Sequence, residues 1–431
     1  MSEQVLTLSI EALAYGGDSV GHTGGRVIFV PDGVPGDEVR VEVVEDKGSF
    51  LRGRLLDITA PSNDRVEPFC PYAVRCGGCQ WQHVDYHAQC TWKEAIVRES
   101  LSRLGGIPDP PVESCLPAPS VTAYRSIARY PARAQGSELI WGYFEHRSHA
   151  LVNIDRCPVA TGTVNDLSVY IRSFFHGKEH IPDLAEITIR TSENIPSALV
   201  TISTGGSFDF SLLARRMFAD FRYLEGLIIR RERGIQLPRH VRTFGAGHRT
   251  ERIAGSKFRI SELSFFQVNV AQTERLVALV GDMLDLQSGE TVVDGYGGVG
   301  LFSLSLCTEA ATVHLFDSSR SAVSDCLSNA EKRGMTMFSA SCEPADRAFG
   351  RIGRADVLII DPPRTGLGKK TALTACGLGA RKVLYVSCNP STLARDLAVF
   401  LGNGYRLERV VPVDMFPHTY HIETAAKLVK K

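Results

Sequence analysis

Residues 291–300 read TVVDGYGGVG, an apolar run that leads directly into a glycine-rich loop. The run Thr291–Asp294 predicts a buried strand, and Leu301–Leu306 after the loop predicts a helix. Glycines between these two elements let the backbone turn tightly and approach a ligand closely. A strand, a glycine-rich loop and a helix in this order form the nucleotide-binding corner of an open α/β sheet. A dinucleotide-dependent oxidoreductase would share this corner, so it indicates the fold class and leaves the reaction open.

Further strands and helices alternate around this loop. Apolar runs at Val313–Asp317, Val357–Ile360 and Lys382–Val386 predict strands, and the spacing of apolar residues over Thr273–Leu284 predicts a helix. Alternation of this kind favours a parallel sheet with helices on both faces. We therefore expect an α/β domain with a Rossmann-like sheet over residues 261–431.

The earlier parts of the chain have different patterns. Short alternating segments such as Val27–Val30 and Val39–Val43, separated by glycine-rich turns, predict a small antiparallel β-barrel over residues 1–60. Strand-like and helix-like runs are mixed over residues 61–260, which predicts a central α+β domain.

The composition is that of a folded globular protein. Of the 431 residues, 44% are hydrophobic and 22% are charged. No run approaches the roughly 18 consecutive apolar residues of a membrane span. The first nine residues lack the basic start and apolar run of a signal peptide. We expect a cytoplasmic protein that has no membrane partner.

Positive charge is concentrated in the centre of the chain. The whole chain has 48 Lys and Arg residues and 48 Asp and Glu residues, but residues 120–260 have 20 against 13. Of these 20, 18 are Arg, whose planar guanidinium suits paired contacts to phosphate. This segment is the candidate surface for a nucleic acid, and an ordinary solvated face is the alternative.

Polar motifs follow two of the predicted strands. Asp361–Arg364 reads DPPR and comes directly after Val357–Ile360, and Ser387–Pro390 reads SCNP and follows Lys382–Val386. Sheets of this class bind ligands at the carboxyl ends of their strands. A strand that ends in Asp-Pro-Pro resembles the substrate-side motif of S-adenosylmethionine-dependent nucleic-acid methyltransferases. Cys388 is therefore placed for chemistry, although a cysteine after an apolar strand is by itself more often a packed thiol.

Cys388 and Glu423 together support one reaction. Addition of a thiolate to C6 of uracil makes an enolate, whose C5 can attack the methyl group of a sulfonium. A general base must then remove the proton from C5 so that the cysteine is eliminated, and a carboxylate against an apolar wall suits this task. The target base must leave its stack to reach such a site. In isolation, Glu423 would be interpreted as a surface carboxylate.

Five motifs in this order resemble those of the RNA 5-methyluridine (uracil-C5) methyltransferase family, most closely its 23S ribosomal RNA branch. The motifs are Phe265–Asn269, Asp294–Gly300, Asp361–Arg364, Ser387–Asp396 and His418–Glu423. The resemblance implies an S-adenosylmethionine-dependent methyltransferase fold, with Cys388 as nucleophile and Glu423 as general base. It also implies that the cofactor and substrate pocket is lined by Gln267, Tyr296, Asp317 and Asp361.

The chain departs from the family pattern at several positions. Gly297 stands where a cysteine is common, Asp317 where Glu is usual, and Tyr420 where a second His is usual. None of these departures removes the nucleophile or the base. The segment 1–60 resembles a TRAM domain, an OB-like β-barrel that helps members of this family to hold RNA.

Cysteine spacing predicts a metal site. Cys70, Cys76 and Cys79 lie on one glycine-containing segment, and Cys157 is the candidate for a fourth ligand. Three close thiols and a distant one favour a 4Fe-4S cluster, and the resemblance implies the same, with zinc as the alternative. The remaining cysteines besides Cys388 are expected to be packed thiols: Cys90, Cys115, Cys307, Cys326, Cys342 and Cys376.

The expected partner is RNA, and no obligate protein partner is evident. Ribosomal RNA is favoured because of the TRAM-like segment and the cysteine cluster, and transfer RNA is the alternative. A cytosine-C5 enzyme would place a cysteine beside the Asp-Pro-Pro motif, and an adenine-N6 enzyme would need an aromatic residue at Arg364. A catalytically inactive RNA-binding or assembly factor is the alternative from another class. The presence of Cys388, Glu423, Gln267 and Asp361 together argues against it.

Overall fold

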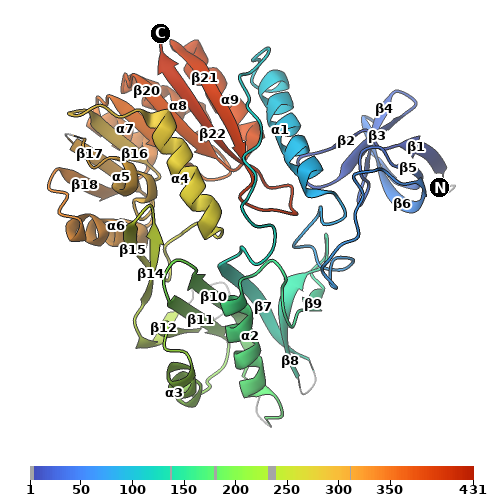
Figure 1. Cartoon of the computed structure of the whole chain (residues 1–431), viewed down its shortest axis with the longest axis horizontal. Coiled ribbons are helices and arrows are strands. Elements are labelled where there is room, and N and C mark those ends of the chain that lie inside the picture. The colour runs from blue at the N-terminus through green and yellow to red at the C-terminus, as the bar shows by residue number, and fades with distance from the viewer. Residues whose placement is uncertain (1–3, 136–137, 179–181, 232–238, 311) are drawn as a thin grey trace.

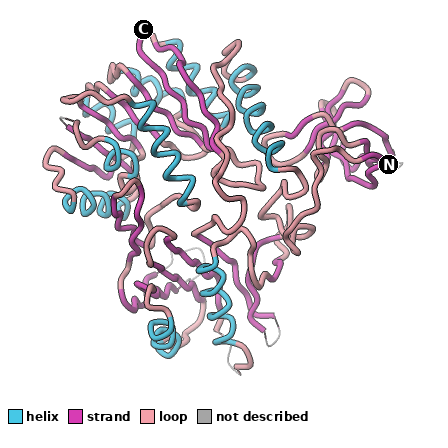
Figure 2. Tube along the Cα trace, in the orientation of Figure 1, coloured by secondary structure: helices cyan, strands magenta, loops and turns pink. Residues whose placement is uncertain are grey.

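The computed structural model describes residues 4–135, 138–178, 182–231, 239–310 and 312–431 (Figure 1). These residues form three large sheets and one two-stranded hairpin. The first sheet lies at one side of the molecule, and the other two lie above one another in the view of Figure 1. Figure 2 shows that long loops fill the region where the three parts meet. No helix among the described residues is long and apolar enough to cross a membrane.

The first sheet closes around its own small core. Its strands are β1 (Val5–Ser9), β2 (Ala12–Leu13), β3 (Ser19–Thr23), β4 (Arg26–Val30), β5 (Glu38–Asp46) and β6 (Phe50–Ala60), in the order β1-β5-β6-β4-β3-β2. Alternate residues of β5, such as Val39 and Val41, are fully buried and pack with Ile28. All pairs are antiparallel except β4 with β6, which is parallel.

Helix α1 (Tyr86–Arg103) follows the cysteine-rich segment. The Asp85 side chain accepts hydrogen bonds from the backbone amides of His87 and Ala88, which caps the first turn. The buried face of α1 carries Ile96 and Val97, which belong to the same apolar core as helices of the third sheet. The chain then runs along the edge of that sheet as far as residue 116, where Leu116 bridges to Val413.

The second sheet forms the central part of the molecule. Its elements are β7 (Ile127–Gln135), β8 (Glu138–Phe144), β9 (Leu151–Asn153), α2 (Gly162–Phe175), β10 (Leu184–Ser192), β11 (Ser197–Thr204), α3 (Ser211–Asp220), β12 (Leu224–Arg231) and β13 (Arg239–Gly245). The strand order is β13-β12-β11-β10-β7-β8-β9, and only β11 with β12 is parallel among the described pairs. A hairpin of β14 (His248–Ile253) and β15 (Ser256–Ser261) leads to the third sheet.

The third sheet carries the glycine-rich loop that follows Asp294. Its elements are α4 (Val270–Leu284), β16 (Thr291–Gly295), α5 (Leu301–Leu306), β17 (Thr312–Asp317), α6 (Arg320–Lys332), β18 (Phe338–Cys342), α7 (Ala345–Ile352), β19 (Val357–Ile360), α8 (Gly368–Gly377), β20 (Lys382–Ser387), α9 (Pro390–Gly402), β21 (Tyr405–Val413) and β22 (Glu423–Lys430). The order is β18-β17-β16-β19-β20-β22-β21.

Strand direction corrects the expectation of a purely parallel sheet. The strands from β18 to β20 in this order are parallel, but β22 runs antiparallel to both β20 and β21. Each face is covered as expected. Leu358 and Ile360 of β19 pack toward α8 and α9, whereas Val357 and Ile359 pack toward α4. The reversal of β22 brings its first residue, Glu423, to the end of the sheet where β20 finishes.

Candidate active site

The site lies at the carboxyl edge of the third sheet, where β19 and β20 end. Asp361 follows β19 directly, and its backbone amide donates a hydrogen bond of 3.2 Å to the carbonyl of Gly295 at the end of β16. Cys388 follows β20. Ser387 is paired with Thr424, the neighbour of Glu423. The structure therefore brings the Asp-Pro-Pro motif, the cysteine and the glutamate to one edge.

The glycine-rich loop has the backbone that a ligand-binding turn requires. Gly298 and Gly300 have φ values of 58° and 89°, and Tyr296 also adopts a positive φ of 60°. A Cβ atom at position 297 would lie 2.5 Å from the Cδ1 atom of Leu315, so glycine is the residue that fits there. The carboxylate of Asp317 accepts hydrogen bonds from the amides of Gly298 (3.1 Å) and Ser319 (2.7 Å), which hold the loop against β17.

A cavity of about 560 Å³, including its mouth, opens beside this loop. Tyr296 and Asp317 line it, as do Glu343 and Asp346, which the sequence analysis did not single out. The missed signal was the place of Glu343 directly after β18 and of Asp346 in the first turn of α7, at the same edge of the sheet. The other two proposed cofactor residues lie outside its lining. Gln267 is buried between β15 and α4, and Asp361 lies at the end of β19.

The carboxyl groups of Asp294, Asp317 and Asp361 act on one another at this edge of the sheet. Burial, together with the nearby carboxylates of Asp294 and Asp317, raises the pKa of Asp361 to about 7. Burial also raises the pKa of Asp294 to about 6. A carboxylate without a nearby cation is disfavoured in such a place, so the site favours a positively charged ligand.

Cys388 is half-buried and surrounded by titratable groups. Burial, and to a smaller extent the charge of Glu423, raises the pKa of its thiol to about 11. Arg364 opposes this shift by its positive charge and by a hydrogen bond to the thiol. At neutral pH the free protein therefore holds a thiol at this position.

Glu423 is almost completely buried, with 3% of its surface exposed. Its Oε1 atom has no hydrogen-bond partner among the described residues. Burial and the neighbouring Asp361 raise its pKa well above the ordinary range, and Arg364 opposes the shift. The structure thus gives Glu423 a buried environment, in contrast to the surface carboxylate that its position alone would suggest.

Arg364 reaches the segment that precedes Glu423. Its Nη2 atom donates a 3.0 Å hydrogen bond to Nδ1 of His421. Burial and Arg364 lower the pKa of His421 to about 4, so the ring is neutral and can accept this bond. The Arg364 carbonyl accepts hydrogen bonds from the side chains of Asn389 (3.1 Å) and Thr392 (3.2 Å), which tie the two motifs together.

Tyr15 from the first sheet also reaches the site. Its hydroxyl donates a 3.1 Å hydrogen bond to the backbone carbonyl of Cys388, 373 residues further along the chain. Its ring packs edge-on against Tyr420 with the centroids 5.6 Å apart. Local sequence patterns carry no signal for a contact over this separation.

The proposed cluster cysteines meet at one place. Cys70, Cys76, Cys79 and Cys157 all line a cavity of about 430 Å³, including its mouth. Burial and the neighbouring thiols raise the pKa of Cys76 to about 11 and that of Cys79 to about 12. Within the described ranges, no three Cys, His, Asp or Glu side chains are close enough to hold a single metal ion.

The other cysteines only partly match the expectation of packed thiols. Cys90, Cys115, Cys307 and Cys326 are buried. Cys376 is half-buried, and Cys342 is exposed at the end of β18, where its strand forms the edge of the sheet. The expectation of a packed thiol was wrong for Cys342, because an edge strand leaves one flank open to solvent.

Known proteins share this architecture. Residues 249–431 match the family described as tRNA (Uracil-5-)-methyltransferase, and residues 1–56 match the TRAM domain. An RNA methyltransferase of Thermosynechococcus vestitus is 34% identical over 443 residues, which cover 98% of this chain and 97% of the relative. One from Gloeobacter violaceus is 35% identical, with 99% and 96% of the two chains covered. The chain belongs to the RNA (uracil-5-)-methyltransferase family.

This RNA methyltransferase is also similar to a solved structure over its full length. The crystal structure of Pyrococcus abyssi tRNA (uracil-54, C5)-methyltransferase in complex with S-adenosyl-L-homocysteine superposes with a TM-score of 0.77. The sequences are 26% identical, and the match covers 98% of this chain and 100% of the other. The enzyme therefore has the S-adenosylmethionine-dependent methyltransferase fold, joined to an N-terminal TRAM domain.

Proposed function

We propose that this enzyme methylates C5 of a uridine in RNA, with Cys388 as nucleophile and Glu423 as general base. The observation that carries the proposal is their shared surroundings. The charges of Arg364 and Asp361 shift the pKa of both groups, and the charge of Glu423 also raises the pKa of Cys388. A nucleophile and a base that act on adjacent atoms of one pyrimidine ring need such proximity.

The proposed reaction has three steps. The Sγ atom of Cys388 forms a bond to C6 of the uridine, and the electron pair of the C5–C6 double bond moves to give an enolate. The C5 atom then takes a methyl group, which S-adenosylmethionine supplies from its sulfonium when it is bound. Glu423 removes the remaining C5 proton, the double bond forms again, and the bond between Sγ and C6 breaks.

Ionisation is the main problem for these two residues. At both residues burial outweighs the single positive charge of Arg364. Cys388, with a pKa of about 11, is therefore a thiol at neutral pH, and the pKa of Glu423 is raised well above its ordinary range. Arg364 is the group that favours the thiolate of Cys388. We propose that it stabilises the thiolate as the nucleophile forms, while His421 fixes the direction of its guanidinium.

The cofactor residues proposed from the sequence fit S-adenosylmethionine in their chemistry. Asp317 and Tyr296 line the cavity beside the glycine-rich loop, where a carboxylate can accept hydrogen bonds from ribose hydroxyls. Gln267 and Asp361 lie outside this lining, and we propose that they bind the part of the cofactor nearest the uridine. The raised pKa of Asp361 is consistent with a neighbour that carries a positive charge.

RNA that contains 5-fluorouridine tests the nucleophile directly, because fluorine at C5 cannot leave as a proton does. With S-adenosylmethionine, the enzyme should form a covalent complex that survives denaturing electrophoresis. The Cys388→Ser variant should form none. The Cys376→Ser variant, which changes a half-buried cysteine of α8 beside Lys430, at the opposite end of the sheet, should react as wild type does. A folded wild-type enzyme that methylates RNA without forming this complex would contradict the proposal.

We propose ribosomal RNA, specifically 23S rRNA, as the first candidate substrate and transfer RNA as the second. The four clustered cysteines support the first, because they accompany the ribosomal branch that the motifs resemble. The second is supported by the similarity to an archaeal tRNA (uracil-54, C5)-methyltransferase. Base-resolved mapping of 5-methyluridine in both RNA classes, with and without the gene, distinguishes them, since one class alone should lose a modified position.

We propose that Cys70, Cys76, Cys79 and Cys157 hold a 4Fe-4S cluster. Four thiols around one cavity support the proposal. Among the described residues no three such side chains are close enough for one metal ion, which favours a larger cluster over zinc, because zinc binds its sulfurs at about 2.3 Å. Methyl transfer needs no electrons, so the proposed role is to hold this part of the fold.

Anaerobic purification tests the cluster. The wild type and the Cys342→Ala variant should be brown and contain iron, whereas Cys79→Ala should lose the colour together with solubility or RNA affinity. Bound zinc without iron in the wild type would support the alternative metal. A colourless, well-folded Cys79→Ala variant that still methylates RNA would contradict the structural role.

We also propose that the three parts of the chain have different roles. The barrel of residues 1–60 and the arginine-rich central part, residues 61–260, hold the RNA, and residues 261–431 form the catalytic domain. An enzyme that modifies RNA in this way is expected to work in the cytoplasm.

A further inference from the structure

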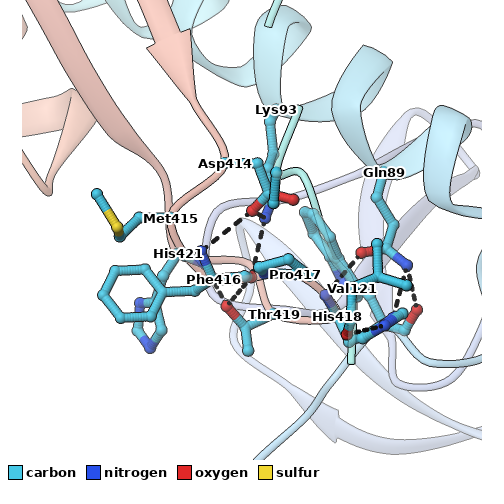
Figure 3. Close-up of polar contacts among 12 residues, drawn as sticks. Gln89, Lys93, Val121, Asp414, Met415, Phe416, Pro417, His418, Thr419 and His421 are labelled. Carbon is cyan, nitrogen blue, oxygen red and sulfur yellow. Dashed lines mark hydrogen bonds and ion pairs between the residues drawn. The ribbon is translucent and has the colours of Figure 1, made fainter. Parts of the chain in front are cut away.

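Residues 414–422 connect β21 to β22 and are called the strap here. The strap ends on Glu423, so its position decides where that carboxyl group lies. Figure 3 shows that side chains from α1 reach into the strap. Successive strap carbonyls are each held by a donor from another part of the chain: Met415 by Asn269 (3.2 Å), Phe416 by Lys93 (3.2 Å), Pro417 by Tyr124 (3.1 Å) and His418 by the Trp81 amide (2.9 Å).

Lys93 holds the start of the strap. Its Nζ atom lies 2.6 Å from Oδ1 of Asp414, and neither side chain is exposed to solvent. The same Nζ donates to the carbonyl of Phe416, and Oδ1 of Asp414 accepts the Phe416 amide at 3.2 Å. One ammonium and one carboxylate thus fix Asp414 and Phe416 at the start of the strap.

Gln89 holds the middle of the strap. Its Oε1 atom accepts a 2.8 Å hydrogen bond from the His418 amide, and its Nε2 atom lies 3.2 Å from Nδ1 of the same residue. Nε2 also donates to the carbonyls of Trp81 and Val84. His418 has a φ of 65°, a backbone conformation that a non-glycine residue adopts only when its surroundings hold it.

The His418 ring is part of this arrangement. Burial lowers its pKa to about 4, so the ring is neutral and has one donor and one acceptor nitrogen. Nε2 of the ring donates to the Val121 carbonyl at 3.0 Å, which leaves Nδ1 to accept from Gln89. The two amide hydrogens of Gln89 are shared among this nitrogen and the carbonyls of Trp81 and Val84.

Gln89 and Lys93 are four residues apart and so share one face of α1. Both side chains are fully buried, although burial of an amide and of a charge is costly. Apolar side chains would stabilise the packing of α1 without that cost. The polar side chains of Gln89 and Lys93 instead fix the conformation of the strap backbone to which they hydrogen-bond.

We infer that Gln89 and Lys93 are positioning residues for the reaction, and that they set the place of Glu423 by fixing the strap. This inference rests on the proposed role of Glu423. The connection is continuous: Lys93 holds the Phe416 carbonyl, which also accepts the Thr419 hydroxyl (2.9 Å), and that hydroxyl accepts the His421 amide (3.2 Å). Glu423 follows two residues later.

The covalent intermediate provides a specific test. A displaced base slows removal of the C5 proton but leaves attack by Cys388 and methyl transfer in place. The methylated complex between enzyme and ordinary uridine RNA should then accumulate on a denaturing gel. Loss of folding has the opposite effect, because it lowers turnover and complex together.

The variant to make is Lys93→Met with Asp414→Leu. Replacement of a buried ion pair by apolar groups is often neutral for stability, whereas removal of one partner leaves an uncompensated charge. A misplacement of about 1 Å costs roughly a hundredfold in rate, so turnover should fall by at least about tenfold. Complex from uridine RNA should increase, with the melting temperature near that of the wild type.

Arg98→Met is the matched control on the same helix. Arg98 also binds two backbone carbonyls, those of Pro110 (3.3 Å) and Val112 (2.6 Å), but none in the strap. The Arg98→Met variant should accumulate no covalent complex, even if the substitution lowers the stability of the protein. If the double variant does not fold, Gln89→Met removes the hydrogen bonds to His418 without leaving a buried charge, and it should also accumulate complex.

The outcomes separate the inference from the proposed function. Unchanged turnover in a folded double variant, or lost turnover without accumulated complex in a folded variant, overturns the positioning role. If Glu423→Gln itself accumulates no complex from uridine RNA, the proposed function of Glu423 fails instead.

Discussion

Replacement of Glu423 by Gln is the sharpest test of the proposed base. The amide has the size of the acid but cannot take a proton from C5. General-base catalysis typically contributes a factor of 10² to 10⁴, or roughly 3–5 kcal/mol of transition-state stabilisation. Release of 5-methyluridine should fall by that factor. The covalent complex with ordinary uridine RNA should accumulate, because the step that breaks it is the one that needs the base.

Stability should change little in this variant. Oε1 of Glu423 has no hydrogen-bond partner among the described residues, and burial raises the pKa of the carboxyl, which favours its neutral form. The substitution therefore removes no bond to Oε1 and replaces the acid by a neutral group of the same size. We expect a melting temperature within about 3 °C of the wild type, the shift that roughly 1 kcal/mol produces in a domain of this size.

The assay is a denaturing gel with labelled RNA, followed by quantification of 5-methyluridine. Glu408→Gln is the matched control, because Glu408 lies on the neighbouring strand β21 and pairs with Lys427 at 2.8 Å, away from the site. Turnover of Glu423→Gln within a few fold of the wild type would refute the assignment of the base. So would a loss of turnover without accumulated complex, since that pattern places the defect before proton removal.

Three further predictions concern the nucleophile. Burial raises the pKa of Cys388 to about 11. The rate at which iodoacetamide alkylates Cys388 in the free enzyme should therefore rise roughly tenfold per pH unit between about pH 7 and 9. Peptide mass spectrometry measures this rate, and a rate independent of pH would contradict the buried thiol. Arg364→Met removes the cation that favours the thiolate, so this rate should fall by about tenfold at pH 7 and recover at higher pH. Tyr15→Phe loses one hydrogen bond to the Cys388 carbonyl, worth about 0.5–1.5 kcal/mol. Formation of the covalent complex with 5-fluorouridine RNA should therefore slow by roughly two- to tenfold. An unchanged rate would show that the barrel does not support the nucleophile.

Local features of the site were predictable because they depend on residues close in sequence. The apolar run before Asp294 and the glycines after it specify a strand and a turn, and the structure has β16 and the loop there. Asp361 and Cys388 follow apolar runs in the same way. Parallel strands place their carboxyl ends at one edge, so these side chains were expected to meet.

Contacts between distant parts of the chain were not predictable in this way. The buried face of α1 includes Gln89 and Lys93, so apolar spacing does not show which face is buried or that it packs beside α9. The hydrogen bond from Tyr15 to Cys388 depends on how the first sheet docks. The direction of β22 also depends on tertiary pairing, and that reversal is what buries Glu423 beside Cys388.

The electrostatics of the site connect these observations. In the free enzyme burial favours the neutral forms of Cys388 and Glu423, although the proposed reaction needs a thiolate and then a carboxylate. Arg364 supplies one positive charge against several buried acids, so a further positive charge in the site favours formation of the thiolate. A sulfonium beside Asp361 would provide it, and methyl transfer would remove it again. Cys388 would thus stay in its less reactive thiol form until the methyl donor is in place, which also limits oxidation of the empty enzyme.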